Sequence, residues 1–148
     1  MLMRIRICQE KDIPRILKLG KDVFKKQKWY TRKYLTEVLH ENPKTCWILE
    51  IGGVIEGARF IADDTDGRAW GWLLIMDKHY RREGLGSKFF LYTAKRLKQL
   101  GFRKIYGECH ATNQVSIEWH LKIGYKLVGV FRDWYGKGND AVVFDYDL

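Results

Sequence analysis

A switch in hydrophobic period near residue 80 constrains the fold of this chain more than any other feature. Residues 68–76 form an apolar, strand-like run, whereas apolar residues recur at helical spacing from Gly84 to Leu100. The two stretches are joined by the sequence Tyr-Arg-Arg-Glu-Gly-Leu-Gly-Ser at residues 80–87. A strand that passes through a glycine loop into a helix is typical of chains that combine both elements in one core. The junction therefore predicts an α/β fold.

The same two periods predict the other elements. Strand-like runs occupy residues 3–8, 45–51, 54–61, 104–109, 126–131 and 141–147. Helical spacing follows the expected strands at residues 3–8, 68–76 and 104–109. A second helix directly follows the helix after residues 3–8. The order β-α-α-β-β-β-α-β-α-β-β predicts one α/β domain over residues 1–148, built around a mixed sheet.

Polar residues that can accept a backbone hydrogen bond mark the expected helix starts. Asp12, Thr31 and Asn113 each precede a helical pattern and are predicted N-caps. The first helical pattern continues to Phe24. In the helix after the glycine loop, the apolar stripe ends with Leu100, which we expect to face the core.

Composition limits the class of protein. A chain of 148 residues with 46% hydrophobic residues can bury a sizeable core and is not disordered. No apolar run reaches the ~18 residues of a membrane span, and the N-terminus lacks a signal-peptide core, so we expect no membrane partner. The cysteines at positions 8, 46 and 109 lack metal-ligand spacing. They indicate reduced thiols in a cytoplasmic protein without a metal site.

The charge balance predicts an anionic partner. A formal net charge of +9 attracts nucleic acid, a phosphate-bearing cofactor or an anionic membrane surface. The basic run at residues 25–33 contains Trp29 and Tyr30, as in a nucleic-acid-binding module. The favoured interpretation of that run is a solvated face beside a helix, which leaves nucleic acid an unlikely partner.

The glycine loop predicts a site for a diphosphate. Gly84 and Gly86 allow successive backbone N–H groups to point into one concavity. The helix behind them adds its own unpaired N–H groups and the positive end of its dipole, and Arg81 and Arg82 add charge. The loop lacks the P-loop spacing, and Phe89 stands where a dinucleotide fingerprint requires its third glycine.

Two motifs in the correct order resemble the GNAT N-acetyltransferase superfamily. Arg81, Gly84 and Gly86 match its pattern R/Q-x-x-G-x-G/A after a strand, and Asn113 and Ser116 match the start of its second signature. The resemblance covers nearly the whole chain. It implies a mostly antiparallel sheet flanked by helices, with acetyl-CoA as co-substrate and no metal. The residues that it assigns to acetyl-CoA are Met76, Arg81, Arg82, Glu83, Gly84, Leu85, Gly86, Ser87, Asn113 and Ser116.

Acetyl transfer to an amine requires a group that removes a proton from the amine. Glu108 is similar in position to the glutamate base of the ribosomal-protein-alanine branch of the superfamily. His110 is the alternative base, since its ordinary pKa of ~6.5 lies nearer to neutral pH. The two residues share one face if the strand persists, because they are two apart. A structural alternative for Glu108 is a rim carboxylate paired with a lysine.

The departing thiolate requires a proton, and two residues are candidate donors. The resemblance places a tyrosine in the superfamily at the position of His120, so this chain departs from the pattern there. His120 either protonates the thiolate or packs against Ser116, one helical turn earlier. Tyr135 is similar to a tyrosine in the loop before the last strand of protein N-acetyltransferases, where it donates the proton or lines the acceptor pocket.

The acceptor site is expected at three aromatic residues between the first two helices, Trp29, Tyr30 and Tyr34. These rings either contact the acceptor or pack against the sheet. The sequence thus predicts an N-acetyltransferase that acts by direct attack in a ternary complex, as a monomer or homodimer. The acceptor is a primary amine, either a protein N-terminus or lysine or a small polyamine or antibiotic. A CoA sensor without transferase activity is the alternative of another class.

Overall fold

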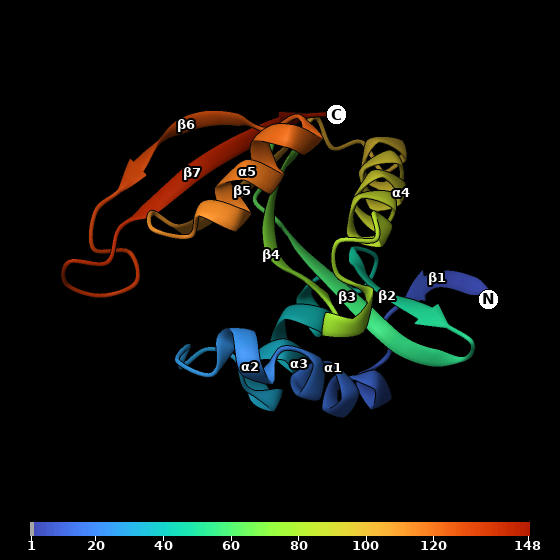
Figure 1. Cartoon of the computed structure of the whole chain (residues 1–148). Coiled ribbons are helices and arrows are strands. Elements are labelled where there is room, and N and C mark those ends of the chain that lie inside the picture. The colour runs from blue at the N-terminus through green and yellow to red at the C-terminus, as the bar shows by residue number, and fades with distance from the viewer. Residues whose placement is uncertain (1) are drawn as a thin grey trace. The chain divides into compact units, whose positions relative to one another are not determined.

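A computed structural model describes residues 2–148 of the chain (Figure 1). The described chain divides into two compact units. The first unit comprises the chain up to Ala62 together with Trp72–Arg96, and the second comprises Asp63–Gly71 and Leu97–Leu148. Strand β4 (Arg68–Met76) contributes residues to both units. The single domain expected from length stays a prediction, and each unit is described by itself.

The described residues contain seven strands in one hydrogen-bonded order, β1-β2-β3-β4-β5-β7-β6. Besides β4, the strands are β1 (Met3–Ile7), β2 (Cys46–Ile51), β3 (Val54–Asp63), β5 (Lys104–His110), β6 (Lys126–Phe131) and β7 (Ala141–Asp147). The helices are α1 (Ile13–Leu19), α2 (Lys21–Phe24), α3 (Arg32–Glu41), α4 (Leu85–Gln99) and α5 (Gln114–Ile123), with 3-10 turns η1 (Glu10–Asp12) and η2 (Lys78–Tyr80). Strands β4 and β5 run parallel, whereas β1–β2, β2–β3, β5–β7 and β6–β7 are antiparallel. The predicted α/β class and mostly antiparallel sheet are confirmed.

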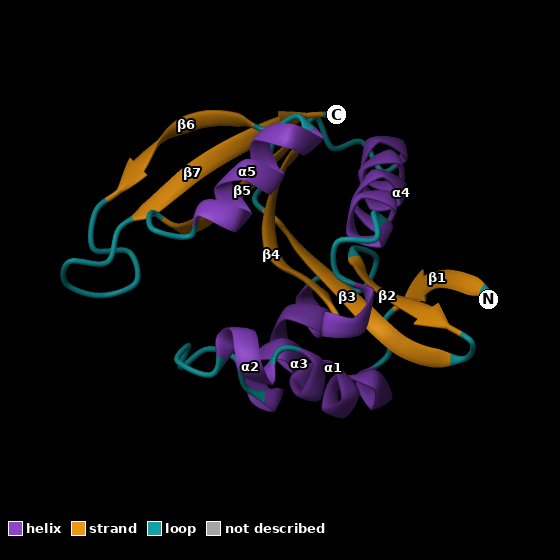
Figure 2. Cartoon of the chain, viewed as in Figure 1, coloured by secondary structure: helices purple, strands orange, loops and turns teal. Residues whose placement is uncertain are grey.

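In the first unit, the alternation of side chains along β3 determines which helix each face meets. Ala58 and Phe60 are fully buried in a core that also contains residues of α1 and α3. The intervening residue, Arg59, points to the opposite face, where its guanidinium carbon lies 4.6 Å from the ring centroid of Phe90 in α4. Figure 2 shows α1 and α3 side by side and α4 apart from them. Helices therefore cover both faces of these strands.

The first helix is shorter than its apolar pattern predicts. Gly20 has φ −96° and ψ 2°, which ends α1, and the short α2 follows it. A Cβ atom at residue 20 would clash with the phenol of Tyr30, whose hydroxyl donates a 2.5 Å hydrogen bond to the carbonyl oxygen of Ile16. The close approach of Tyr30 therefore requires glycine at this position, and the prediction of one helix through Phe24 was wrong.

Of the three predicted helix N-caps, Thr31 and Asn113 cap their helices and Asp12 does not. Thr31 caps α3 by accepting from the backbone N–H of Tyr34 at 3.2 Å, and Asn113 caps α5 by accepting from that of Ser116 at 3.1 Å. Both predictions are confirmed. Leu100 lies one residue beyond the end of α4 and is 44% exposed, so the prediction that it faces the core was wrong.

Asp12 makes no side-chain cap for α1, and that prediction was wrong. Its carboxylate instead accepts two hydrogen bonds from the guanidinium of Arg6, at 2.8 and 3.0 Å, and one from the backbone N–H of Gln9 at 2.8 Å. Burial opposes the charge of Asp12, but these hydrogen bonds outweigh burial and hold its pKa below the ordinary value. Asp12 therefore fixes β1 to the start of the helical segment.

Asp12→Ala is expected to lower the free energy of unfolding by about 3 kcal/mol, because it leaves the part-buried Arg6 without its main partner. Because the pKa of Asp12 is lowered by folding, its contribution is complete above the ordinary carboxyl pKa. It is lost as the pH falls through the lowered value. Urea unfolding at neutral pH measures the loss. The matched control is Asp147→Ala, an exposed carboxylate paired with Lys104, which should cost much less because solvent screens the pair. Equal costs for the two variants would contradict the role of Asp12.

In the second unit, α5 covers one face of the β5–β7 pair (Figure 2). The His120 ring stacks on Phe144 of β7 with centroids 4.6 Å apart, and a Cβ atom at Gly107 of β5 would lie 3.5 Å from His120 Nε2. Because side chains alternate along a strand, the neighbouring Glu108 projects from the opposite face. The two faces of β5 therefore have different surroundings, one beneath a helix and one among aromatic side chains.

Candidate active site

The loop that precedes α4 has the backbone of an anion site. Arg82 and Gly84 both adopt left-handed conformations, with φ of 65° and 78°. Such residues turn the backbone so that successive N–H groups face one concavity. Helix α4 begins directly afterwards, at Leu85, and the N–H groups of its first turn have no acceptor within the helix. The loop and helix together can hold a diphosphate through backbone groups.

Gly84 and Gly86 differ in whether backbone conformation or packing requires a glycine. A side chain at Gly84 would meet nothing within 4 Å, so glycine is favoured there by its positive φ. Gly86 lies inside α4, and its nearest neighbour would be Met76 Cγ at 3.7 Å, an ordinary contact. Neither packing nor backbone conformation excludes a side chain at residue 86. Because Gly86 has no side chain, open space remains at the start of the helix, and a bulky anion can approach there.

Met76 closes the end of β4 beside this loop, in the same unit. Its side chain is buried, and its carbonyl oxygen accepts a 2.9 Å hydrogen bond from Arg81 Nε. The sulfur of Met76 would lie only 2.7 Å from a Cβ atom at Gly57 of β3, which explains the small residue there. The structure thus brings together the predicted residues from Met76 to Ser87.

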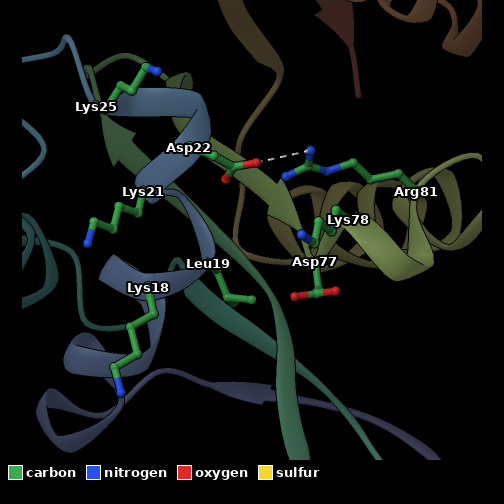
Figure 3. Close-up of a pocket in the computed structure, with 8 residues that line it drawn as sticks. All are labelled: Lys18, Leu19, Lys21, Asp22, Lys25, Asp77, Lys78 and Arg81. Carbon is green, nitrogen blue, oxygen red and sulfur yellow. Dashed lines mark ion pairs between the residues drawn. The ribbon is translucent and has the colours of Figure 1, made fainter.

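Arg81 also lines a hollow of about 470 Å³ in the first unit (Figure 3). Figure 3 shows its guanidinium directed toward Asp22, and the two groups are 3.8 Å apart. Four lysines line the same hollow: Lys18, Lys21, Lys25 and Lys78. With only Asp22 and Asp77 as acidic neighbours, the hollow carries excess positive charge. Arg81 was expected to add charge here, but the grouping of these lysines was not predicted, because they lie on α1, on α2, just after α2 and on η2 and share no motif.

The remaining residues assigned to acetyl-CoA lie in the second unit. Asn113 and Ser116 form the N-terminal cap of α5, as described above. The hydroxyl of Ser116 is 3.4 Å from Nδ1 of His120, one turn further along the helix. These contacts give both residues a structural role.

Glu108 is a part-buried carboxylate on the face of β5 that α5 does not cover. Burial raises its pKa, and the nearby indole N–H groups of Trp70 and Trp134 lower it in part. The net effect is a pKa above the ordinary glutamate value. No lysine contributes to this shift, so the surroundings differ from those of a rim carboxylate in an ion pair. A carboxylate of raised basicity among aromatic rings can accept a proton from an amine.

His110 shares the face of Glu108, as predicted, but both of its ring nitrogens are engaged. The backbone N–H of Thr112 donates to Nδ1 at 3.1 Å, so that nitrogen is an acceptor without a proton. Nε2 then carries the proton and donates to Asn139 Oδ1 at 3.1 Å. The ring also stacks on Tyr135 with centroids 5.7 Å apart. These contacts hold the loop between β6 and β7 and favour a positioning role over that of a base.

The two candidate proton donors lie on opposite faces of the second unit. Burial, and then the charge of Glu108, raise the pKa of Tyr135, so its phenol stays protonated at neutral pH. His120 donates from Nδ1 to the carbonyl oxygen of Ser116 at 2.7 Å, and its ring stacks on Phe144. The arrangement around His120 is that of a packed histidine.

The predicted acceptor-side aromatics form a cluster in the first unit. Trp29, Tyr30 and Tyr34 are half-buried against the core of α1, α3 and the strands. The ring of Tyr34 lies 5.5 Å from that of Trp72 in β4, and Trp29 lies 6.2 Å from the same ring. The packing role anticipated for these residues accounts for their contacts.

The sequence analysis missed the two indoles that hold Glu108. Trp70 reaches this position only through the parallel β4–β5 register, in which it aligns with Tyr106 and their rings stack at 5.9 Å. Trp134 lies in an irregular loop, where neither period applies.

Within residues 2–148, no helix is both long and apolar enough to cross a membrane. The same residues contain no group of three histidine, cysteine or acidic side chains that could hold a metal ion.

Comparison with known proteins agrees with this geometry. Residues 10–125 match the acetyltransferase (GNAT) family. An N-alpha-acetyltransferase of Sulfurisphaera tokodaii is 25% identical over 155 residues, which cover 93% of this chain and 89% of that protein. Ard1 from Thermoplasma volcanium has a TM-score of 0.91 at 18% identity, covering 100% of this chain and 99% of its own. The ribosomal-protein-S18-alanine N-acetyltransferase of Escherichia coli has a TM-score of 0.85 at 16% identity, with 99% and 94% covered. A PaiA N-acetyltransferase from Thermoplasma acidophilum, solved with coenzyme A, has a TM-score of 0.82 at 15% identity, with both chains fully covered.

Proposed function

Because this chain belongs to the acetyltransferase (GNAT) family, and is therefore an acetyl-CoA-dependent N-acetyltransferase, we propose that its acceptor is the α-amino group of a polypeptide. The observation that carries the proposal is the part-buried Glu108, held by two indole N–H groups and not by a lysine. The N-alpha-acetyltransferase relative supports the same class of acceptor.

Residues of the first unit are proposed to hold the donor. The loop from Arg82 to Gly84 and the N–H groups at the start of α4 would bind the diphosphate of acetyl-CoA. The excess positive charge of the hollow beside Arg81 would attract the anionic co-substrate. Met76, at the end of β4, would contact the pantetheine arm.

The choice of an α-amine follows from the free energy needed to deprotonate the acceptor. A lysine amine with pKa ≈ 10.4 is neutral in only about one molecule in ~2,500 at pH 7, a cost of ~4.6 kcal/mol. A peptide α-amine with pKa ~7.7–8.0 costs only ~1–1.4 kcal/mol. Glutamate is a weak base for a lysine, but a glutamate of raised pKa can serve for an α-amine.

The proposed step is a direct attack. The nitrogen of the acceptor forms a bond to the thioester carbonyl carbon, and the bond from that carbon to sulfur breaks. Glu108 accepts the proton that leaves the nitrogen, and the thiolate takes up a proton to give free coenzyme A. We assign this second proton to Tyr135, because its phenol stays protonated and it lies on the same face as Glu108.

A panel of acceptors tests the proposed function. Release of free thiol from acetyl-CoA should be fast with short peptides that have a free α-amine. It should fall by roughly 200- to 400-fold at pH 7 when the same peptides carry a blocked α-amine and one free lysine, in proportion to the neutral fraction of that amine. Faster turnover with a polyamine, an aminoglycoside or a blocked lysine peptide would overturn the choice of acceptor.

A further inference from the structure

The uncovered face of the second unit contains a hollow of about 320 Å³ that the proposed mechanism does not use. This volume lies within the range of ~300–1,000 Å³ that is usual for ligand pockets. Its walls are apolar and come from four strands: Trp70, Tyr106, Val128, Val130, Phe131 and Val143.

Parallel rings form one wall of the hollow. Trp70 stacks on Tyr106 at 5.9 Å and 15° and lies nearly parallel to Phe131 at 6.4 Å and 10°. The indole N–H of Trp70 also lies near enough to the carboxylate of Glu108 to lower its pKa. One side chain therefore belongs both to the wall of the hollow and to the group that would deprotonate the acceptor. A molecule whose amine reached Glu108 would have its neighbouring atoms at this wall.

The charges of the hollow cancel. Among the described residues that line it, the ionisable groups besides the phenol of Tyr106 are Asp64 and Arg68. Their charged groups lie 3.8 Å apart, and Arg68 also donates to the carbonyl oxygen of Asp64 at 3.1 Å. No unpaired carboxylate remains for a second ammonium group, as a polyamine or aminoglycoside would require. The hollow suits an uncharged ligand.

The apolar lining remains open to solvent in the described chain. Val128 of β6 is 55% exposed, and Phe131 is 40% exposed. Apolar residues gathered at one place on the surface mark a binding site more often than they mark chance exposure. Their position beside the partner of Glu108 identifies the acceptor as the occupant.

We infer that this hollow binds the first side chain of the acceptor polypeptide and selects a large, uncharged, apolar residue there. The inference rests on the proposed function, because it takes the amine at Glu108 to be the α-amine of that residue. The substrate class is thus a polypeptide that begins with residues such as leucine, methionine or phenylalanine. Polypeptides that begin with alanine, glutamate or lysine are poor substrates.

The test compares peptides that differ only in their first residue. The value of kcat/KM with leucine, methionine or phenylalanine first should exceed that with alanine first by roughly 10- to 100-fold, as expected for an apolar pocket. The difference should lie mainly in KM, because the pocket binds the substrate and its transition state alike. Lysine first and glutamate first should fall below alanine.

Phe131→Asp places a carboxylate in the hollow, because Phe131 aligns with Ala141 and Ala141 with His110, on the face of the sheet that Glu108 shares. It should lower kcat/KM for the leucine-first peptide by roughly 10- to 100-fold and raise that for the lysine-first peptide. The matched control is Leu127→Asp, on the same strand, 60% exposed and outside the hollow. The control should leave both values within about threefold, and circular dichroism with acetyl-CoA titration verifies that each variant is folded.

The outcomes separate the inference from the proposed function. Equal rates for all first residues, with no effect of Phe131→Asp, would overturn the inference and leave α-amine acetylation intact. No acetylation of any free α-amine would overturn the proposed function itself. A dimer in the wild type that Phe131→Asp dissociates, without a change in acceptor preference, would assign the hollow to self-association and contradict the inference.

Discussion

Glu108→Gln is expected to lower kcat for acetylation of a peptide α-amine by ~10²–10⁴-fold, the usual contribution of a general base. Glutamine keeps the size of the side chain and one acceptor for the indole N–H groups of Trp70 and Trp134. It cannot accept the proton of the acceptor. Steady-state thiol release measures the change, and acetyl-CoA affinity should be unaffected because Glu108 is not among the residues proposed to hold the donor.

His120→Phe is the matched control for this variant. The His120 ring stacks on Phe144, on the face of β5 opposite to Glu108, and phenylalanine preserves an aromatic ring there. We expect kcat to stay within about threefold of the wild type, with an unchanged pH profile. A small decrease in kcat for Glu108→Gln together with a large decrease in kcat for His120→Phe would reverse the assigned roles.

The pH dependence gives a second readout on Glu108. The carboxylate is the active form, so its contribution grows as the pH rises through its pKa, which burial places above the ordinary glutamate value. The ratio of wild-type to Glu108→Gln kcat/KM should approach one at low pH and rise to a plateau above that pKa. The substrate amine titrates equally in both measurements and cancels from the ratio. A ratio that does not vary with pH would exclude Glu108 as the base.

Gly84→Val is expected to weaken acetyl-CoA binding by about 10- to 100-fold. Gly84 has a φ of 78°, which a β-branched residue adopts only under strain, so the loop should relax to a conformation that no longer directs its N–H groups into one concavity. Isothermal titration with acetyl-CoA measures the dissociation constant.

Gly53→Val controls for the strain alone. Gly53 has a similar φ of 82°, and a side chain there would also meet nothing within 4 Å, but it lies in the turn between β2 and β3. Both variants should lose comparable thermal stability, and Gly53→Val should bind acetyl-CoA as the wild type does. An unchanged dissociation constant for Gly84→Val would contradict a diphosphate site in this loop.

The sequence predicted the elements well because their patterns are local. Strands with clear alternation and helices with side-chain caps, such as Thr31, depend on residues only a few positions apart. Predictions failed where a distant residue decided the outcome. The phenol of Tyr30 requires glycine at residue 20 and so ends α1 early, and Arg6 draws Asp12 away from its capping role.

Prediction of the site from sequence also failed where residues distant in the chain come together. The donor loop is contiguous in sequence, so its glycines and its preceding strand could be recognised together. The surroundings of Glu108 could not be recognised from sequence, because Trp70 comes from β4 and Trp134 from the loop after β6. Periodicity placed His110 on the correct face, but only the contacts with Thr112 and Asn139 reveal that its nitrogens are occupied.

One peptide tests the central claim that Glu108 serves an α-amine. It begins with leucine, has a free N-terminus and contains a single internal lysine, so both kinds of amine compete in one reaction with acetyl-CoA. Fragmentation in the mass spectrometer then locates the acetyl group. The account predicts acetylation of the N-terminal leucine, with its loss in Glu108→Gln. Acetylation of the lysine in the wild type would contradict it.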